Sequence, residues 1–505
     1  MSATVGAALA WWARNTPTAE ALLFEDETLD YATVESWSSR VAQHLRAEGV
    51  REGDRVGLFA PNSVPWPVAA LGVIKAGAVL VPLNSRFTAA ELRKVLDDSG
   101  ADVVVAADAL TSVAEAAGTL GDHVGVVPFS AVDALRGGPA STFRVDRDQD
   151  EPIAVIFTSG STGRSKGVVL TNRTLLSIVF EATLVEEGFH RGSSALLVLP
   201  LAFTPGLVWG LLMTTVLGGK LVIEKELTPS RAVRLIEQHR IEAVFGVPLV
   251  YQALASAPEF AEADLTSLRS AVVGGAAVSA SLLQAWVAKD VALRQIYGMT
   301  EAGGIATSTP VREFREHPDS CGSGHIFTEV RVVRENGTPA PAGEQGELVI
   351  RGPGVTPGYW NSPEVNAEVF RDGWLHSGDL GVMDEDGRVR FVDRLKDLII
   401  TGGINVSPFE LEQVVGAIDG VAECVVIAAP DPKFGETPAV IVHAEPGLTE
   451  AEVVEACSQV LADFKVPRYV VLSEEPLPRL PSGKISKTRI REQYADLTER
   501  YSKVR

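Results

Sequence analysis

Residues 158–166 read TSGSTGRSK and follow an apolar run at residues 153–157 that is typical of a buried β-strand. Closely spaced glycines let backbone N–H groups converge on an anion, while the hydroxyl groups and Lys166 add further donors. This composition predicts a loop that binds a polyphosphate. The loop is not a Walker A motif, because its glycines are too close together and no Gly-Lys-Ser/Thr follows them.

A second segment, YGMTEAGG at residues 297–304, places the hydroxyl of Thr300 next to the carboxylate of Glu301. Mg²⁺ takes one or two oxygen ligands from a protein and otherwise keeps water or phosphate oxygens. If this segment lies beside the phosphate loop, it predicts a magnesium site. Taken alone, the same residues would also suit a solvated turn.

Three further segments contain polar or flexible residues that could do chemistry. They read WLHSGDLG at residues 374–381, DRLKDLIITGGINVSPFELE at residues 393–412, and PRLPSGKISKTRIR at residues 478–491, which includes Lys484.

The elements that must position these segments alternate between short β-branched runs and amphipathic helical stretches, and this pattern predicts an α/β fold. Residues 55–60 and 101–108 are predicted strands. A helix between them is predicted to begin at the capping box Thr88-x-x-Glu91 and to end at Gly100. Parallel sheets covered by helices are therefore expected in the first half of the chain.

Two segments suggest domain boundaries. Residues 136–150 are rich in Gly, Pro, Ser and charge, and they could divide two subdomains. Asp386-Gly387 is a strong hairpin signal just before a second boundary. We therefore expect a large N-terminal domain at residues 1–394 and a small lid domain at residues 395–505.

Composition excludes several classes of protein. A chain of 505 residues allows about three structural units, and 46% apolar with 22% charged residues is typical of a globular protein. The net charge of −20 argues against binding to nucleic acid or to anionic lipid. Cys321, Cys424 and Cys457 lack metal-binding spacing and suit a reducing cytoplasm.

Neither of two apolar stretches predicts insertion into a membrane. Residues 5–13 lack the preceding basic region of a signal peptide. The uncharged residues 192–219 could span a bilayer by length, but Pro200, Pro205 and Gly206 interrupt them, which predicts two short buried segments around a turn. We expect a cytoplasmic protein without a transmembrane segment. Peripheral membrane contact stays open, as does the choice between a monomer and a homodimer.

Together these motifs resemble the adenylate-forming superfamily of acyl-CoA synthetases, nonribosomal peptide adenylation domains and beetle luciferases, and in particular its acyl-CoA synthetase and fatty-acid–CoA ligase branch. The match covers nearly the whole chain. IKAGAVLVPLN at residues 74–84, VVGGAAVS at residues 272–279 and GELVIRGPGVTPGYW at residues 346–360 fill the intervals in the family's order. The resemblance implies a large N-terminal domain of stacked, helix-covered sheets and a small, mobile α+β lid.

The resemblance implies a carboxylate–CoA ligase that uses ATP, Mg²⁺ and coenzyme A. The acid and ATP would give an acyl-adenylate and pyrophosphate, and the thiol of CoA would then displace AMP after rotation of the C-terminal domain. Lys484 would bridge the substrate carboxylate and the α-phosphate, with Thr300 and Glu301 as the other catalytic residues. Glu301 and Thr158 would hold Mg²⁺. Lys396 would be the hinge of the rotation.

The binding residues that the resemblance implies fall into three groups. The nucleotide would be bound by Thr158, Ser159, Gly160, Ser161, Thr162, Gly163, Lys166, Gly275, Ala276, Ala277, Tyr297, Gly298, Met299, Thr300, Asp379, Arg394, Lys396 and Asn405. Gly402 and Gly403 would line the tunnel for the CoA thiol, because only a bare backbone lets pantetheine pass. The acyl pocket would be formed by Phe203, Leu207, Trp209, Phe245, Val247, Leu249, Val273, Ala302 and Gly303.

These pocket residues are almost all apolar, which favours a hydrophobic acid. A dicarboxylate or an amino acid is disfavoured, because the pocket segments contain no charged partner for a second charge. The small residues 302–304 leave fatty, aryl and polycyclic acids open. Two departures from the family pattern, Ser165 in place of proline and Phe203 in place of histidine, affect loop stiffness and the gate of the pocket.

Three other functions share parts of this motif set. A stand-alone enzyme that loads the acyl group onto a carrier protein would carry every motif, although no carrier domain follows Arg505. A luciferase-like oxygenase is disfavoured because such relatives usually end in SKL, whereas this chain ends in SKVR. A noncatalytic nucleotide-binding regulator is disfavoured because Lys166, Glu301 and Lys484 are all present.

Overall fold

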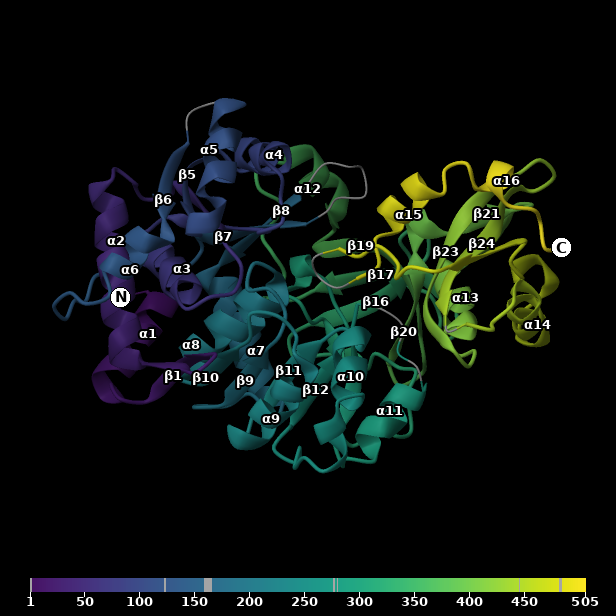
Figure 1. The fold of residues 1–505 in the computed structure, drawn as a ribbon, viewed down its shortest axis with the longest axis horizontal. Helices are drawn as coiled ribbons and strands as arrows, with labels where there is room; N and C mark the ends of the chain where they lie inside the picture. The colour runs from purple at the N-terminus through teal and green to yellow at the C-terminus, as the bar shows by residue number, and fades with distance from the viewer. Residues whose placement is uncertain are drawn as a thin grey trace.

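The computed structural model describes residues 2–121, 124–158, 166–275, 278, 280–444, 446–480 and 484–505. These residues form an α/β fold with a large N-terminal domain of several sheets and a small C-terminal domain (Figure 1). The predicted fold class is therefore confirmed.

The first sheet has six strands in the order β6-β5-β3-β4-β7-β8. Its pairs are parallel except for the antiparallel pair of β7 and β8. The strands are β3 (Arg55–Phe59), β4 (Val79–Leu83), β5 (Ala101–Ala106), β6 (Gly125–Pro128), β7 (Pro152–Thr158) and β8 (Lys166–Thr171). The predicted helix between β4 and β5 is α4 (Ala89–Ser99), which has both hydrogen bonds of the capping box and ends at Gly100 with φ +67°.

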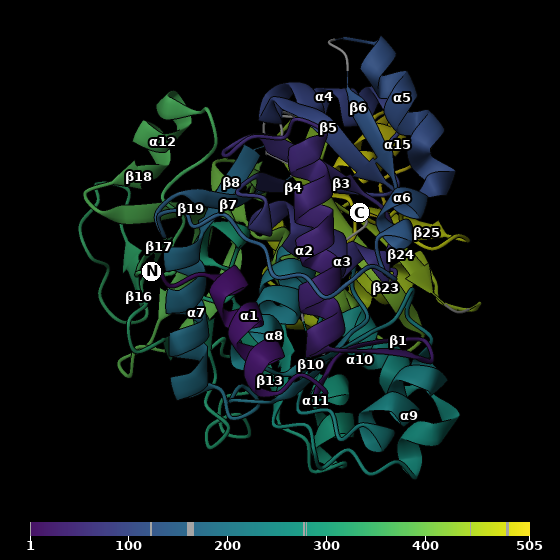
Figure 2. The ribbon, with the colours of Figure 1, turned by 90° about the vertical axis from the view of Figure 1, so that its left-hand side faces the viewer.

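Helices α2 (Tyr31–Ala47) and α3 (Pro65–Lys75) lie side by side, and α3 packs against β3 and β4 of this sheet (Figure 2). Their backbones approach closely, because a Cβ atom on Gly72 would lie 2.6 Å from Val41 Cγ1. Residues 136–150 form neither a helix nor a strand, and their backbone is tied to these helices through Val145 N–H, which donates to Lys75 O at 2.8 Å.

The second sheet has nine strands in the order β15-β14-β13-β12-β11-β9-β10-β1-β2. They are β1 (Glu20–Phe24), β2 (Glu27–Asp30), β9 (Ser194–Leu197), β10 (Lys220–Ile223), β11 (Ala243–Gly246), β12 (Ser270–Val273), β13 (Leu293–Tyr297), β14 (Thr307–Ser308) and β15 (Ser323–Gly324). Helices α9 (Pro229–Gln238), α10 (Pro248–Ala255) and α11 (Ala280–Val287) cover one face and share a hydrophobic cluster with it.

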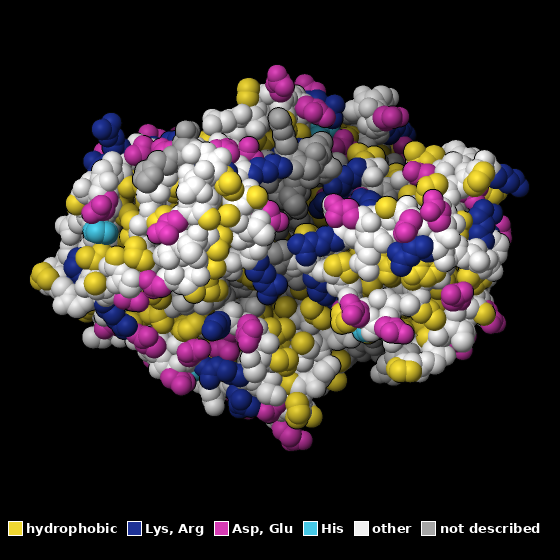
Figure 3. Space-filling view, turned by 45° about the horizontal axis from the view of Figure 1, so that its top comes forward, with side chains coloured by type: hydrophobic (Ala, Val, Ile, Leu, Met, Phe, Trp, Pro, Cys, Tyr) yellow, Lys and Arg dark blue, Asp and Glu magenta, His cyan; other side chains and the backbone are white. Residues whose placement is uncertain are grey.

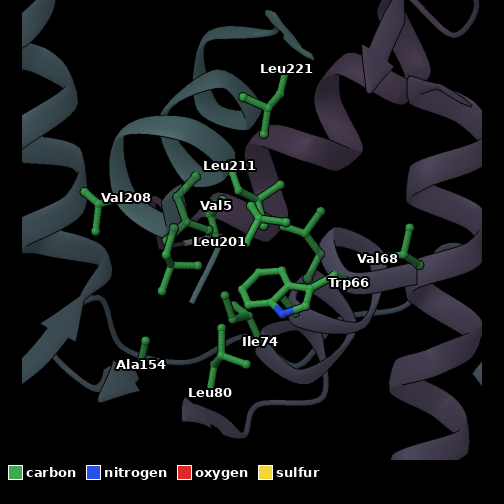
Figure 4. Close-up of a cluster of buried hydrophobic side chains, with 14 of the residues drawn as sticks. Val5, Trp66, Val68, Ile74, Leu80, Ala154, Leu201, Val208, Leu211 and Leu221 are labelled. Carbon is green, nitrogen blue, oxygen red and sulfur yellow. The ribbon is translucent and has the colours of Figure 1, made fainter. Parts of the chain in front are cut away.

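A larger hydrophobic cluster joins the other face of this sheet to the six-stranded sheet. It includes residues of α1 (Val5–Asn15) and α7 (Asn172–Val185), and Figure 4 shows Trp66, Leu80 and Leu211 meeting within it. One continuous, close-packed core therefore connects the two sheets, and it fixes the positions of residues at the ends of their strands relative to one another.

The uncharged stretch at residues 192–219 is interrupted as predicted. Strand β9 ends before the turn, and the chain then forms η2 (Pro205–Leu212), a π-helix that continues into α8 (Met213–Leu217). Among the described residues, no helix has the length and apolar character needed to cross a membrane.

A third sheet contains the last strands of the N-terminal domain, and a fourth sheet lies in the C-terminal domain. The third contains β16 (Glu329–Val333), β17 (Gln345–Arg351), β18 (Phe370–Arg371), β19 (Trp374–Met383) and β20 (Val389–Arg394), and the predicted Asp386-Gly387 hairpin joins β19 to β20. The fourth contains β21 (Ile399–Thr401), β22 (Ile404–Val406), β23 (Val421–Asp431), β24 (Gly435–Ala444) and β25 (Tyr469–Ser473). Helices α13 (Pro408–Val415), α14 (Glu450–Val460), α15 (Lys487–Gln493) and α16 (Leu497–Arg500) accompany it.

Candidate active site

Tyr297, Asp379 and Arg394 meet at the junction of the second and third sheets. Tyr297 is the last residue of β13, and its Oη donates a hydrogen bond to Asp379 Oδ2 at 3.0 Å. Asp379 and Arg394 are partners in the register of β19 and β20, and Arg394 Nε lies 3.4 Å from Asp379 Oδ1. Burial raises the pKa of Asp379, although Arg394 and the hydrogen bond from Tyr297 oppose the shift. Three of the residues predicted to bind the nucleotide are thus in contact.

Lys484 reaches this group from the C-terminal domain. Its side chain lies against Gly275, in the loop after β12, so closely that a Cβ atom on Gly275 would be 2.8 Å from Lys484 Nζ. Burial and the positive charge of Arg394 lower the pKa of Lys484, while Asp379 acts in the opposite direction. The predicted catalytic lysine therefore sits among the predicted nucleotide residues of the N-terminal domain.

Thr300 and Glu301 lie in the short 3₁₀ helix η4 (Thr300–Ala302), directly after the turn that follows β13. Thr300 Oγ1 is 2.8 Å from Thr204 Oγ1. Glu301 is buried, and its Oε1 accepts a hydrogen bond from Tyr359 Oη at 2.7 Å. Lys166 Nζ lies 5.1 Å from the centroid of the Tyr359 ring, so the end of the predicted phosphate loop approaches the predicted metal ligand.

Glu301 suits a divalent cation. A buried carboxylate normally pairs with a cation, yet no Lys, Arg or His within the described ranges forms an ion pair with it. Those ranges also contain no cluster of three or more His, Cys, Asp or Glu that could enclose a metal ion. One or two protein oxygens, completed by phosphate and water oxygens, are the ligands that Mg²⁺ prefers, and Glu301 can supply one of them.

The phosphate loop itself lies mostly outside the described residues. This applies to Ser159, Gly160, Ser161, Thr162 and Gly163, and also to Ala276 and Ala277 after β12. The residues at the two ends of the loop are described. Thr158 and Lys166 face each other as the terminal pair of β7 and β8, and Thr158 Oγ1 donates to Lys166 O at 3.3 Å.

Gly298 and Met299 form the turn between Tyr297 and η4. A Cβ atom on Gly298 would lie 2.2 Å from Gly304 O, so this turn folds tightly only with glycine at that position. Met299 O accepts the backbone N–H groups of Ala302 and Gly304 at 3.0 and 2.9 Å. These bonds fix the position of Thr300 relative to Tyr297.

The predicted hinge and thiol residues lie on the small domain's side of this group. Lys396 is exposed in η5 (Leu395–Asp397). Gly402 and Gly403 form an exposed turn between β21 and β22, with φ of +58° and +82°, and Asn405 follows them. Asn405 lies in β22. Within the described part of the chain, Gly402, Gly403 and Asn405 have no hydrogen bond to Tyr297, Asp379 or Lys484.

Asp393 connects β20 to the first helix of the C-terminal domain. Its buried Oδ2 accepts hydrogen bonds from Ser407 Oγ at 2.7 Å and from Phe409 N at 2.9 Å, at the start of α13. The ring of Phe391 contacts Phe409, with centroids 5.2 Å apart, and stacks on Tyr297 at 6.2 Å. Phe391 thus links Tyr297, a predicted nucleotide residue, to the small domain.

The predicted acyl-pocket residues divide between the two faces of the nine-stranded sheet. Leu207, Trp209 and Phe245 belong to the larger cluster between the sheets. Gly303 and the half-buried Phe203 belong to the neighbouring turns, and Trp209 Nε1 donates to Gly303 O at 2.8 Å. Ala302 is the last residue of η4 and packs in the cluster of Tyr297.

Three residues predicted to line the pocket do not join this group. Val247 and Val273 pack on the opposite face, under α9 to α11, and the Leu249 side chain is 38% exposed. Val273 faces away from Leu207, Trp209 and Phe245 because side chains alternate between the two faces along a strand. Its neighbour Val272 is the β12 residue that packs in their cluster.

Several residues of this site were missed in the sequence. The sequence gives no local pattern that marks Tyr359, Thr204 or Phe189 as site residues. Each contacts its partner, which lies far away in the sequence, only in the folded structure. Phe391 and Asp393 could have been found, because they alternate with buried Val389 along one face of β20.

The surface around the site is locally basic despite the acidic composition. Figure 3 shows a hollow between the two domains with Lys and Arg side chains gathered around it. Such a concentration of positive charge favours an anionic ligand.

Two family models match the chain. The model for the AMP-binding enzyme matches residues 9–360, and the model for the AMP-binding enzyme C-terminal domain matches residues 410–484. A feruloyl-CoA synthase from Amycolatopsis sp is 39% identical over 486 residues, covering 95% of this chain and 97% of that protein. The long-chain-fatty-acid–CoA ligase FadD13 of Mycobacterium tuberculosis is 35% identical over 478 residues, covering 93% and 94%. The structure of ATP-bound MatB from Rhodopseudomonas palustris superposes with a TM-score of 0.89 at 32% identity, covering 98% of this chain and all of that one.

Proposed function

We propose that this chain, which belongs to the AMP-binding enzyme family and is an AMP-forming acid–thiol ligase, joins a hydrophobic carboxylic acid to coenzyme A. The observation that carries the proposal is the position of Lys484, which lies against Gly275 and interacts electrostatically with Asp379. A lysine from one domain inserted between nucleotide-site residues of the other is suited to a reaction between two anions.

In the first half-reaction, a carboxylate oxygen of the acid attacks the α-phosphorus of ATP and pyrophosphate leaves. Both reactants are negatively charged, so a fixed cation must offset their repulsion and the charge that develops. Lys484 supplies this charge in a partly buried position, where it acts more strongly than in water. Tyr297, Asp379 and Arg394 hold the nucleoside, and Thr300 orients the α-phosphate.

Mg²⁺ would neutralise phosphate charge during this step, held by Glu301 with Thr158 as a second oxygen ligand. The hydrogen bond from Tyr359 Oη fixes the direction of the Glu301 carboxylate. Lys166 and the hydroxyl groups of residues 158–162 would bind the departing pyrophosphate.

In the second half-reaction, the thiolate of CoA attacks the acyl carbon of the adenylate, forms the thioester and releases AMP. We place the boundary between the domains at residues 394 and 395, with Lys396 as the hinge about which the small domain turns. This turn would withdraw Lys484 and bring Gly402 and Gly403 to the thiol path. Asn405 would then approach the nucleotide.

The apolar character of Leu207, Trp209 and Phe245 supports a hydrophobic acid. The names of the two relatives, a feruloyl-CoA synthase and a long-chain-fatty-acid–CoA ligase, indicate aryl and fatty acids as the classes to test.

The test is AMP and pyrophosphate release with ATP, Mg²⁺ and a panel of alkyl and aryl acids, with and without CoA. Sustained release that requires CoA, together with a thioester of the correct mass, supports the proposal. A single stoichiometric burst that CoA cannot sustain would overturn the choice of CoA and would favour a carrier protein as the acceptor.

A further inference from the structure

Trp209 is held rigidly by one hydrogen bond and two aromatic neighbours. Its indole Nε1 donates to Gly303 O at 2.8 Å. The centroid of its ring lies 5.0 Å from that of Phe245 and 5.8 Å from that of Phe189, and the two phenyl rings also contact each other. All three aromatic side chains are buried. The indole therefore cannot turn away without losing its hydrogen bond and displacing both rings.

The glycines opposite Trp209 leave space that protein side chains already occupy. A Cβ atom on Gly304 would lie 2.5 Å from Trp209 Nε1, and one on Gly303 would lie 2.4 Å from Ile178 Cδ1. Small residues at these positions therefore accommodate an indole and an isoleucine side chain rather than an extended acyl group.

Trp209 lies close to Thr300, which is proposed to orient the α-phosphate in the reaction. Gly303 follows η4, and its O atom accepts the Trp209 bond three residues after Thr300. A Cβ atom on Gly304 would also lie 3.3 Å from Thr204 Cγ2, and Thr204 is the hydrogen-bond partner of Thr300. An acyl group whose carboxylate lies beside Thr300 would therefore meet the indole after a short distance.

From these contacts we propose that Trp209 forms the end of the acyl pocket and restricts the substrate to compact hydrophobic acids. Short alkyl acids and acids with a single aromatic ring belong to this class, whereas long-chain and polycyclic acids do not. The inference rests on the proposed ligase function and narrows its substrate class. A hydrophobic pocket rejects a group that is too large by steric exclusion, so the expected discrimination is strong in that direction.

The test compares wild type with Trp209→Leu and Trp209→Phe on benzoate, cinnamate, octanoate, dodecanoate and a polycyclic acid, with CoA-dependent AMP formation as the measurement. Wild type should use benzoate or cinnamate in preference to dodecanoate. In Trp209→Leu, the ratio of kcat/KM for dodecanoate to that for benzoate should rise by about 10- to 100-fold, the discrimination that even one methylene group gives in a hydrophobic pocket. Trp209→Phe keeps an aromatic ring and should give a smaller rise.

Trp286→Leu is the matched control. Trp286 is also fully buried and also contacts two aromatic rings, but it lies on α11 in the cluster under the other face of the sheet. Its replacement should lower stability and leave the ratio of the two acids unchanged.

The outcomes are distinct. If wild type uses dodecanoate as well as it uses cinnamate, or if both Trp209 variants keep the wild-type ratio, the role of Trp209 is overturned while the ligase function stands. If wild type gives no CoA-dependent AMP with any acid, the ligase function itself is overturned, and the inference falls with it.

Discussion

Lys484 and Gly275 are in direct contact across the two domains. A Cβ atom on Gly275 would lie 2.5 Å from Lys484 Cε and 2.8 Å from Nζ, so the lysine occupies the space that the missing side chain leaves. Gly275 also has φ +81°, a conformation that side chains rarely adopt. The nucleotide-site loop is therefore shaped to receive the lysine.

Lys484→Ala should separate the two half-reactions. Acyl-AMP formation should fall by about 10²- to 10³-fold, because a preorganised charge of this kind contributes that much to a rate. The conversion of supplied acyl-AMP to the thioester should stay near the wild-type rate. Pyrophosphate release measures the first step, and thioester formation by mass measures the second. Lys465→Ala, which removes a lysine paired with Glu410 elsewhere in the small domain, serves as the control. Equal losses in both steps would contradict this division of roles.

Gly275→Ala should reduce acyl-AMP formation by displacing the Lys484 side chain. Gly373→Ala is a matched control, because Gly373 also has φ +81° but has no atom within 4 Å of a Cβ position. Backbone strain alone should therefore affect both variants, whereas the loss of adenylation should be specific to position 275. In the Lys484→Ala background, Gly275→Ala should add little further loss of rate. Fully additive effects in this cycle would show that the two residues act independently.

The first half-reaction should lose activity at alkaline pH. Burial and the charge of Arg394 lower the pKa of Lys484, and the protonated lysine is the active form. The rate of acyl-AMP formation should therefore decline as pH rises, at a lower pH than the usual lysine pKa of about 10.4 would give. Lys484→Arg should remove this decline, because a guanidinium group stays protonated. A single-turnover pH profile of acyl-AMP formation tests this, and an identical decline in the arginine variant would argue against Lys484 as its source.

Lys75→Ala should destabilise the large domain without a direct effect on the chemistry. Lys75 Nζ lies 2.8 Å from Glu35 Oε2, and the two side chains are only 1% and 6% exposed. Removal of one partner leaves a buried charge unpaired, at a cost of about 3–5 kcal/mol. Arg334→Ala, which breaks the exposed pair with Glu344, should lower stability far less, because solvent screens this pair. Urea unfolding followed by intrinsic fluorescence measures both variants, and similar midpoints for the two would disprove the expectation.

Local signals in the sequence predicted the framework well. The capping box at Thr88 has both of its hydrogen bonds, and the Asp386-Gly387 turn joins β19 to β20. Each of these features depends on residues within a few positions of one another. The alternation of short strands with helices was sufficient to predict the α/β class for the same reason.

Contacts between distant segments could not be derived in this way. The hydrogen bond from Tyr359 to Glu301 depends on where the third sheet meets the second. The filling of the Gly304 space by Trp209 depends on how the π-helix η2 packs against the turn after β13. The choice between Val272 and Val273 depends on the phase of β12, which a strand with apolar residues on both faces does not reveal.

The carboxylate of Asp393 ties the orientation of the small domain to two hydrogen bonds that share one acceptor atom. One oxygen atom receives both Ser407 Oγ and Phe409 N, so a modest tilt of α13 would lengthen both bonds at once. A buried acceptor left without its donors costs free energy, and intermediate tilts would pay this cost before new contacts form. In the domain rotation proposed above, both hydrogen bonds would have to break together, so this one side chain would contribute to the barrier between the two chemical steps.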